Sequence, residues 1–189
     1  MGHSHTKGWI FGYKLHLTST TTAAAGYLVV PLTAADVTTS NIQDNQMYVT
    51  LTSSSSSSVF SLSSVLYMAA DPGYDDKKLY EYSKKTLGID LICPIVERYK
   101  NTPKKRLELV CFYESSLGQV IYSRRRISIE PLIEHIKSVF RIDPLPVHGF
   151  NTVSAIVLLS VLLYQLMVYY NCKTKNINPK SIKYMLGTW

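Results

Sequence analysis

The stretch VLYMAADPGYDDKKLYEYSKKTLGIDLICPIV, residues 65–96, decides the class of fold. Its first six residues, 65–70, form an uninterrupted apolar run that predicts a strand buried on both faces, and the Asp-Pro-Gly triplet at 71–73 predicts a tight turn. Asp76 can then cap a helix that ends at Gly88, because its carboxylate can accept from backbone N–H groups of the first turn. A second apolar segment, 89–96, predicts another strand. Strand, helix and strand in this order are typical of an α/β layered domain.

The N-terminal part of the chain predicts a β-hairpin. Residues 9–17 (WIFGYKLHL) alternate with a period of two, which is the pattern of a half-buried strand. Residues 27–32 (YLVVPL) predict an antiparallel second strand, and Pro31 places it at a sheet edge because proline cannot donate to a ladder. A helix and a serine-rich linker are expected over 36–64.

Charge is distributed unevenly along the chain. The 189 residues are 46% hydrophobic and 17% charged, which excludes wholesale disorder and a collagen-like or coiled-coil rod. The net charge is +7, yet residues 1–70 carry two basic and two acidic side chains, against 12 and 9 in residues 71–130 and 6 and 2 in residues 131–189. A polyanionic partner, either nucleic acid or an anionic membrane surface, is therefore expected to bind the second half of the chain.

The cysteines and the N-terminal histidines do not indicate a metal centre. Cys93, Cys111 and Cys172 are odd in number and widely spaced, so neither a disulfide framework nor a zinc ribbon is predicted, and a reducing compartment is expected. His3 and His5 could chelate a metal, but they have no cysteine or carboxylate beside them. A polar lead-in to a strand is the preferred interpretation.

One apolar segment raises the question of a membrane span. Residues 153–170 (VSAIVLLSVLLYQLMVYY) contain no formal charge over 18 positions, which is the lower limit for crossing a bilayer. Ser154, Ser160 and Gln165 interrupt it, and no second apolar stretch of that length exists. A helix buried in the core of a soluble protein is therefore preferred, and a single membrane span remains the alternative.

The basic excess gathers in two places in the second half. Residues 98–106 (RYKNTPKKR) hold five basic side chains and no acid, and Arg124, Arg125 and Arg126 follow in a row. A charge run is usually a solvated face, but aromatic residues lie between these cations and a carboxylate-bearing helix comes next. Contact with nucleic-acid phosphates is the preferred interpretation, and the candidate residues in this region are Lys104, Lys105, Arg106, Arg124, Arg125 and Arg126.

The helix that follows is expected to begin at Ser128. This serine is a suitable N-cap, and Pro131 is tolerated in a first turn. The expected buried stripe is Ile129, Ile133, Ile136 and Phe140. One carboxylate and two cations share the opposite face: Glu130, Lys137 and Arg141.

Two carboxylates stand out as candidates for chemistry. Asp71 lies at the carboxyl end of an apolar strand, where open α/β sheets place ligand sites, and Glu130 lies among cations. Carboxylates near Lys and Arg are what magnesium-dependent phosphoryl transfer on nucleic acid requires. Taken alone the pair is a weak signal, because an aspartate capping a turn and a glutamate on a surface helix are both common.

Four blocks of the sequence resemble a known family: KGWIFGYKLHL (7–17), PLTAADVTTSNIQDNQ (31–46), ADPGYDD (70–76) and RRISIEPLIEHIKSVFRIDPLPVHG (125–149). They are similar to successive blocks of the DDE transposases of bacterial and archaeal insertion sequences, which are ribonuclease H-like nucleotidyltransferases. The most specific piece is Arg126, three residues, Glu130, six residues and Lys137. The tyrosine usually found three residues before this arginine is replaced by Ser123, and Tyr122 stands one place away.

The resemblance implies a fold, an activity and site residues. The expected fold is a ribonuclease H-like mixed sheet flanked by helices. Asp71 and Glu130 correspond to the second and third catalytic carboxylates, as ligands of two Mg²⁺ or Mn²⁺ ions, and Arg126 and Lys137 correspond to contacts with the transposon end. The family nicks DNA hydrolytically, and the freed 3′-hydroxyl then attacks target DNA. Segment 153–170 resembles the closing core helix of the family, which lowers the weight of the membrane alternative.

The first catalytic aspartate of the family has no counterpart here. It lies on a central strand preceding the one that matches residues 9–17, and neither Asp36 nor Asp44 substitutes for it, because both match other family positions. The sequence therefore predicts a sheet without its first, central strand, with Pro31 and Pro94 on edge strands. We expect the chain to be the C-terminal part of a transposase, inactive in strand cleavage when alone. A non-catalytic DNA-binding remnant or regulator of transposition is the alternative.

The expected organisation is a single partial catalytic domain over 1–189, with transposon and target DNA as partners. A second copy or an upstream transposase piece is a further possible partner, and the expected location is the cytoplasm, at the nucleoid when bound to DNA. The parts are a hairpin at 1–35, a helix and linker at 36–64, strand-helix-strand at 65–97, a basic DNA-facing region at 98–149, and a core helix and tail at 150–189.

Overall fold

The computed structural model describes residues 2–4, 8–10, 12–20, 22–24, 27–29, 32–56, 65–95, 104–174 and 178–185. Part of the expected serine-rich linker and residues 98–103 of the basic stretch lie outside these residues, as does His5. Lys104, Lys105 and Arg106 begin helix α3 (Lys104–Glu114), but their side chains are also outside the described set. Their expected role in DNA contact therefore stays a prediction.

The chain packs as two compact units. Unit 1 contains residues 1–42 and 128–189, and unit 2 contains residues 43–127. Each unit has its own apolar clusters of buried side chains. The sequence predicts one partial domain, so this division adds a boundary that the pattern of residues does not indicate.

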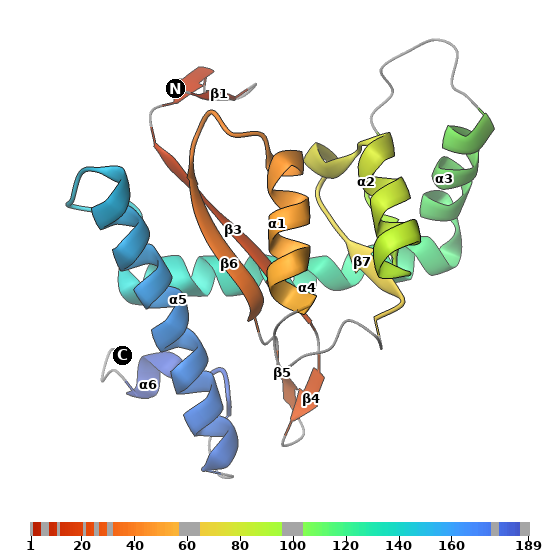
Figure 1. Cartoon of the computed structure of the whole chain (residues 1–189). Helices are drawn as coiled ribbons and strands as arrows, with labels where there is room; N and C mark the ends of the chain where they lie inside the picture. Colours follow the sequence, from red (N-terminus) through yellow and green to blue (C-terminus); the bar gives the residue numbers. More distant parts are fainter. Residues whose placement is uncertain are drawn as a thin grey trace. The chain divides into compact units, whose positions relative to one another are not determined.

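Unit 1 contains an antiparallel pair of strands, β3 (Tyr13–Ser19) and β6 (Leu32–Thr39), which lie side by side in Figure 1. Leu15 and Leu17 of β3 pack against the apolar core, as the alternation of residues 9–17 predicts. His16, between them, is also buried, and its Nε2 lies 2.8 Å from Oγ1 of Thr38 on the neighbouring strand. This hydrogen bond offsets the cost of burying a polar ring.

The pairing of the hairpin differs from the prediction. The expected second strand, 27–32, is wrong as the partner of β3, because β5 (Tyr27–Val29) pairs with β4 (Thr22–Ala24) instead. The true partner, β6, runs through residues 36–39, where the sequence predicts the start of a helix. Three threonines and a valine in β6 explain this, because β-branched side chains favour a pleated strand.

The first predicted strand is also divided. Residues 8–10 form β2 (Gly8–Ile10), which pairs antiparallel with β1 (Gly2–Ser4), and β3 begins only at Tyr13. The exposed Gly12 lies between them in a bend, and glycine in a strand pattern commonly marks such an interruption.

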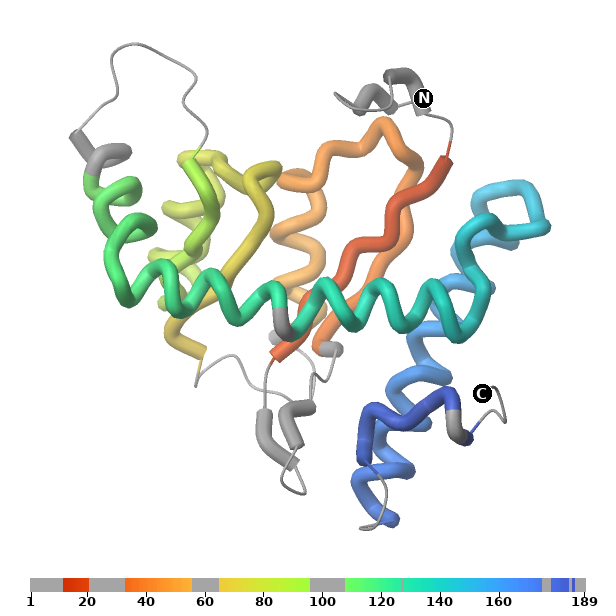
Figure 2. The backbone as a smooth tube through the Cα atoms, turned by 180° about the vertical axis from the view of Figure 1, so that it is seen from behind, coloured from red at the N-terminus to blue at the C-terminus, as the bar shows by residue number. Residues whose placement is uncertain are grey.

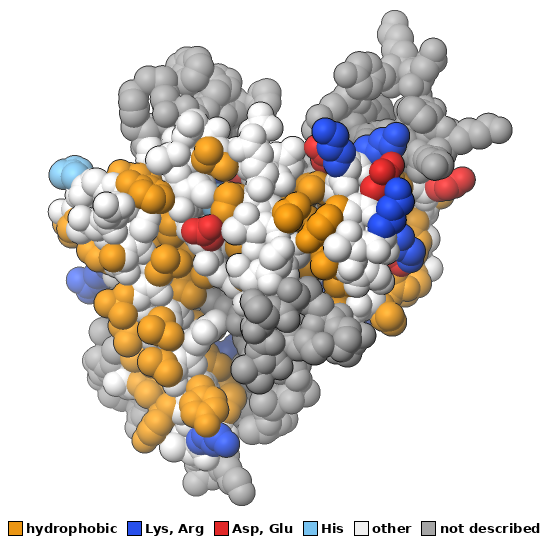
Figure 3. All heavy atoms as spheres, in the orientation of Figure 1, with side chains coloured by type: hydrophobic (Ala, Val, Ile, Leu, Met, Phe, Trp, Pro, Cys, Tyr) orange, Lys and Arg blue, Asp and Glu red, His pale blue; other side chains and the backbone are white. Residues whose placement is uncertain are grey.

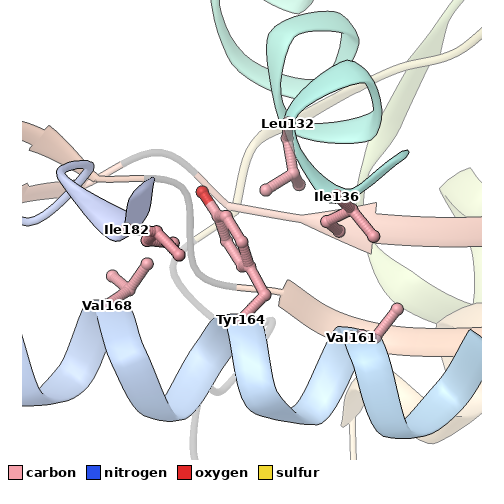
Figure 4. Packing of buried hydrophobic residues seen from close by; sticks show 6 residues of the cluster. All are labelled: Leu132, Ile136, Val161, Tyr164, Val168 and Ile182. Carbon is pink, nitrogen blue, oxygen red and sulfur yellow. The ribbon is translucent and has the colours of Figure 1, made fainter. Parts of the chain in front are cut away.

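Three helices form the main core of unit 1. Leu132 and Ile136 of α4 (Ser116–Phe140) point toward Val161, Tyr164 and Val168 of α5 (Phe150–Lys173), and Ile182 of α6 (Ile182–Met185) closes the cluster (Figure 4). Ile136 is fully buried, as predicted for a residue of the buried stripe. Leu132 is buried too, although it does not belong to the predicted stripe. Ile129, Ile133 and Phe140 are half-buried.

Helix α4 begins earlier than the sequence predicts. It starts at Ser116, so the expected N-cap Ser128 is wrong and lies inside a continuous helix, which Figure 2 shows from end to end. The arginine run at 124–126 consists of good helix formers, which explains why the helix passes through it. Pro131 therefore lies in the helix interior rather than in a first turn. The boundary between the two units falls between Ile127 and Ser128, inside this helix.

Unit 2 contains the strand-helix-strand segment. Strand β7 (Tyr67–Ala69) pairs in parallel with β8 (Asp90–Ile92). Between them lie a 3-10 turn, η2 (Pro72–Tyr74), helix α2 (Lys77–Tyr82) and a π-helical turn, η3 (Ser83–Leu87). This order confirms the predicted strand, helix and strand, although both strands are shorter than expected. The predicted burial of the first strand on both faces is wrong, because Tyr67 is exposed and Met68 and Ala69 are half-buried.

Local signals in unit 2 act as the sequence indicates. The Asp76 carboxylate accepts from the backbone N–H of Lys78 at 2.8 Å and caps α2. Gly88 ends the helical segment with a φ of 69°, a left-handed conformation that favours glycine.

The core of unit 2 combines apolar and hydroxyl-bearing side chains. Tyr48, from α1 (Asp44–Ser56), is buried with Leu79 and Leu91. The Tyr48 hydroxyl lies 2.7 Å from Oγ of Ser83, which in turn donates to the backbone carbonyl of Leu79 at 2.7 Å. These bonds satisfy the two hydroxyl groups inside the core.

The chain is a mixed α/β protein, which confirms the expected class. Among the described residues the strands form four two-stranded sheets rather than one continuous mixed sheet. Only β7 and β8 are parallel within this set.

Helix α5 is apolar on its exposed face as well as its buried one. Of the residues the structure describes, it forms the one helix long and apolar enough to cross a membrane, with a mean hydropathy of 2.0 over an 18-residue window that is 33% buried. One such helix is weak evidence for a span, because core helices pass the same test. Figure 3 shows apolar side chains along the exposed face of α5. The exposed large apolar residues of this helix are Phe150, Leu158, Leu159, Leu162, Leu163, Leu166, Tyr169 and Tyr170. The expected burial of this helix in a core therefore holds for one of its faces only.

Candidate functional site

Asp71 lies directly after strand β7, as the sequence predicts. Ala70 extends the ladder by donating to the carbonyl of Ile92 at 2.9 Å, and Asp71 then occupies the position before turn η2. Its backbone carbonyl accepts from the N–H of Tyr74 at 3.0 Å, while its side chain makes no capping hydrogen bond. The carboxylate is 56% exposed and projects from the end of the parallel pair.

The Asp71 carboxylate is held by an arginine that the sequence assigns to DNA contact. Nη1 of Arg125 donates to Oδ1 of Asp71, and the Arg125 side chain is only 16% exposed. Both residues belong to unit 2. The second arginine of the run is therefore turned toward the protein, whereas Arg124 and Arg126 on either side of it are exposed.

Tyr122 supports this arginine from one helical turn earlier. The Arg125 guanidinium carbon lies 5.1 Å from the centre of the Tyr122 ring, within the range of a cation–π contact. Tyr122 is buried and meets Tyr113 of α3 edge to face, with ring centres 5.3 Å apart. Burial raises the pKa of the Tyr122 hydroxyl, and the positive charge of Arg125 acts in the opposite direction. The sequence analysis notes Tyr122 only as displaced from a family position.

A second carboxylate approaches the same turn. The Asp44 side chain at the start of α1 lies so close to Gly73 that a Cβ at position 73 would be 3.2 Å from Oδ2 of Asp44. Burial, followed by the charges of Asp44 and Asp71, raises the pKa of Tyr74 to about 12. The turn is therefore a locally negative environment in which Arg125 is the cation that contacts Asp71.

The residues of the predicted signature in α4 lie mostly on exposed surface. Arg126, Glu130 and Lys137 are exposed, and of the predicted face of Glu130, Lys137 and Arg141 only the first two lie on the helix. Lys137 pairs with Asp143, with 3.3 Å between Nζ and Oδ2. Arg141 is exposed but follows the last residue of α4 and has a φ of 50°. Asp71 belongs to unit 2 and Glu130 to unit 1, so their pairing in one site stays a prediction.

The described residues do not form a metal centre. No group of three or more His, Cys, Asp or Glu side chains that could hold a metal ion occurs among them. One oxygen of Asp71 accepts from the guanidinium of Arg125, so a cation at this carboxylate would have to displace an existing ion pair.

Comparison with known proteins places the chain in a family. The sequence profile of the family described as transposase DDE domain matches residues 1–166. The chain therefore belongs to the DDE transposase family, in agreement with the resemblance of its sequence blocks. No curated protein and no solved structure matches the chain significantly. Transposases act on DNA, and DDE transposases generally use divalent metal ions, which gives the carboxylates and cations above a functional context.

Proposed function

We propose that the chain takes part in DNA transposition by binding transposon DNA, with Asp71 and Glu130 as the second and third carboxylates of a ribonuclease H-like site. The observation that carries this proposal is the family match over residues 1–166, which covers both carboxylates and all the basic residues singled out. The position of Asp71 at the end of a parallel strand supports its assignment.

The proposed DNA contacts are the exposed cations of the second half of the chain. Arg124 and Arg126 are exposed on the N-terminal half of α4, in unit 2, and Lys137 and Arg141 are exposed in unit 1. Such cations bind phosphates, because each one that neutralises a phosphate releases condensed counterions. The basic residues that begin α3 extend the proposed set: Lys104, Lys105 and Arg106.

Catalysis by this chain alone is not expected. The family requires three carboxylates, and the blocks that resemble it supply two, Asp71 and Glu130. The ion pair between Asp71 and Arg125 also supports a resting state in which one of them is engaged. The proposed activity is therefore binding by the isolated chain, with strand cleavage only in a complete site.

DNA binding is tested by fluorescence anisotropy on a labelled DNA duplex, over a series of salt concentrations. The double variant Arg124→Gln/Arg126→Gln is expected to weaken binding and to reduce the slope of log affinity against log salt by about 2, because two phosphate contacts are lost. The matched control, Lys77→Gln/Lys78→Gln, removes two exposed charges from α2 in the same unit. Equal affinities and slopes for all three proteins would contradict the proposed DNA contacts.

Cleavage is tested on the same duplex with Mg²⁺ or Mn²⁺. The purified chain is expected to leave the DNA intact. Cleavage that disappears in Asp71→Asn would overturn the proposal that the two carboxylates, Asp71 and Glu130, do not suffice for strand cleavage.

A non-catalytic regulator of transposition is the second candidate. It is favoured by the engagement of the Asp71 carboxylate in an ion pair and by the lack of a three-ligand metal group among the described residues. A regulator is expected to inhibit a complete transposase on shared DNA ends, and the double arginine variant is expected to lose that inhibition.

A further inference from the structure

Arg125 is the more buried partner in the ion pair at the end of β7. The Asp71 carboxylate is 56% exposed, whereas the Arg125 side chain is 16% exposed and contacts Asp71 through Nη1. An arginine that serves only to bind DNA would be expected to direct its guanidinium to solvent. This one is directed to the carboxylate at the strand end.

Two tyrosines hold the guanidinium in place. Tyr122 lies one turn before Arg125 in α4, and its ring centre is 5.1 Å from the guanidinium carbon. Tyr113 of α3 packs against Tyr122 at nearly a right angle, 74° between ring planes. A buried ring under a planar cation limits the orientations that the cation can adopt. Arg125 is therefore pre-organised toward Asp71.

The environment of Asp71 attracts cations. Asp44 approaches the adjacent turn at Gly73, and the charges of Asp44 and Asp71 both raise the pKa of Tyr74. Arg125 therefore contacts a carboxylate oxygen in an environment whose negative charge would also attract a metal ion.

We propose that Arg125 is a built-in counterion of Asp71 that competes with divalent metal for this carboxylate, held in position by the ring of Tyr122. The inference rests on the proposed function, because it takes Asp71 to be a metal-binding carboxylate of the DDE site. Arg125 is thereby separated from its neighbours: Arg124 and Arg126 bind DNA, whereas Arg125 controls access to Asp71.

The test measures Mn²⁺ binding to the full chain, by the electron paramagnetic resonance signal of free Mn²⁺, without DNA and without an activity assay. Arg125→Gln is expected to bind Mn²⁺ at least about threefold more tightly than the unchanged chain, because the metal no longer displaces an ion pair of ordinary strength. Arg125→Met, which keeps apolar contact with Tyr122, is expected to behave in the same way and covers the case in which the glutamine variant fails to fold.

Two further variants identify the carboxylate and the charge effect. Asp71→Asn combined with Arg125→Gln is expected to lose the gain in affinity. Lys78→Gln removes one exposed positive charge from the same unit and is expected to leave Mn²⁺ affinity unchanged.

Equal Mn²⁺ affinity in the unchanged chain and both Arg125 variants, absence of Mn²⁺ binding from all of them, or a gain that survives Asp71→Asn would each overturn the inference. Failure of the proposed function is recognised separately, because it appears as loss of salt-dependent DNA binding in the anisotropy experiment.

Discussion

The guanidinium of Arg125 donates to the carboxylate of Asp71, joining residues 54 positions apart within unit 2. Asp71 follows strand β7 of the parallel pair and Arg125 lies on α4. The ion pair therefore connects two elements that are far apart in the sequence. The two residues belong to different predicted groups, one to the carboxylates and the other to the DNA-binding cations. Their contact makes the strand end and the arginine run one site.

The strength of this ion pair can be measured by a double-mutant cycle. Asp71→Asn, Arg125→Gln and the double variant are expected to give a coupling free energy of about 0.5–1 kcal/mol, because the carboxylate is half-exposed and solvent screens the interaction. Urea denaturation at low and high salt provides the values. The coupling should shrink at high salt, and a coupling that does not depend on salt would argue against an electrostatic origin.

The core of unit 1 is expected to depend strongly on Ile136. This side chain is fully buried among α4, α5 and α6, so Ile136→Ala should lower the free energy of unfolding by about 2–5 kcal/mol through lost burial and a cavity. The control is Leu159→Ala on the outer face of α5, where the side chain is 54% exposed. Its expected cost is below about 0.5 kcal/mol. Similar costs for the two variants would place the core elsewhere.

The hydroxyl pair in unit 2 predicts an asymmetry between two small substitutions. Ser83→Ala removes the hydroxyl that Tyr48 contacts, so the buried phenol hydroxyl loses this hydrogen bond. The free energy of unfolding is expected to fall by about 1–3 kcal/mol. Tyr48→Phe is expected to cost less, about 1 kcal/mol, because Ser83 still donates to the carbonyl of Leu79. Thermal or urea denaturation of both variants tests the order, and the reverse order would contradict the assigned hydrogen bonds.

The stability of unit 2 is expected to fall at alkaline pH through Tyr74. Burial and two carboxylates raise the pKa of this tyrosine to about 12, whereas in the unfolded chain it is about 10. Between these values the unfolded chain loses the proton first, so the folded state binds more protons and its stability decreases as pH rises. Below pH of about 10 the contribution is fully present.

Tyr74→Phe removes this titration. Urea denaturation from pH 9 to pH 12 should show a shallower alkaline decline in the variant than in the unchanged chain. Tyr164 in unit 1, whose pKa burial also raises to about 12, offers the matched variant Tyr164→Phe. If neither substitution changes the slope, the alkaline decline has another source.

Local patterns account for what the sequence predicted well. Strand β7 ends just before Asp71 because an apolar run meets Asp-Pro-Gly. Asp76 caps α2 because its short carboxylate side chain reaches the N–H groups of the first turn. Gly88 ends the segment because it adopts a positive φ at no steric cost. These signals act within a few residues of each other, so the sequence displays them directly.

The sequence misplaces the start of α4 and the partner of β3, because two local sequence signals compete at each place. Ser128 and Pro131 together resemble a helix start, yet the arginines before them carry α4 straight through. The partner of β3 was misplaced because the apolar stretch 27–32 is more conspicuous than the threonine-rich β6 that forms the ladder. The contact between Arg125 and Asp71 depends on tertiary packing, and its only trace in the sequence is the spacing of Tyr122 and Arg125, which places them one turn apart on a helix.

Pro131 interrupts the backbone hydrogen bonding inside helix α4. Proline has no N–H, so the carbonyl of Ile127 receives no hydrogen bond from four residues ahead, and this gap in the ladder coincides with the boundary between units 1 and 2. We therefore expect this one helix to unfold as two cooperative segments, the first in contact with Tyr113 of α3 through Tyr122 and the second packed in the core of unit 1 through Ile136. Amide hydrogen exchange should report one protection level before Ile127 and another after Pro131, so that a single helix melts as two.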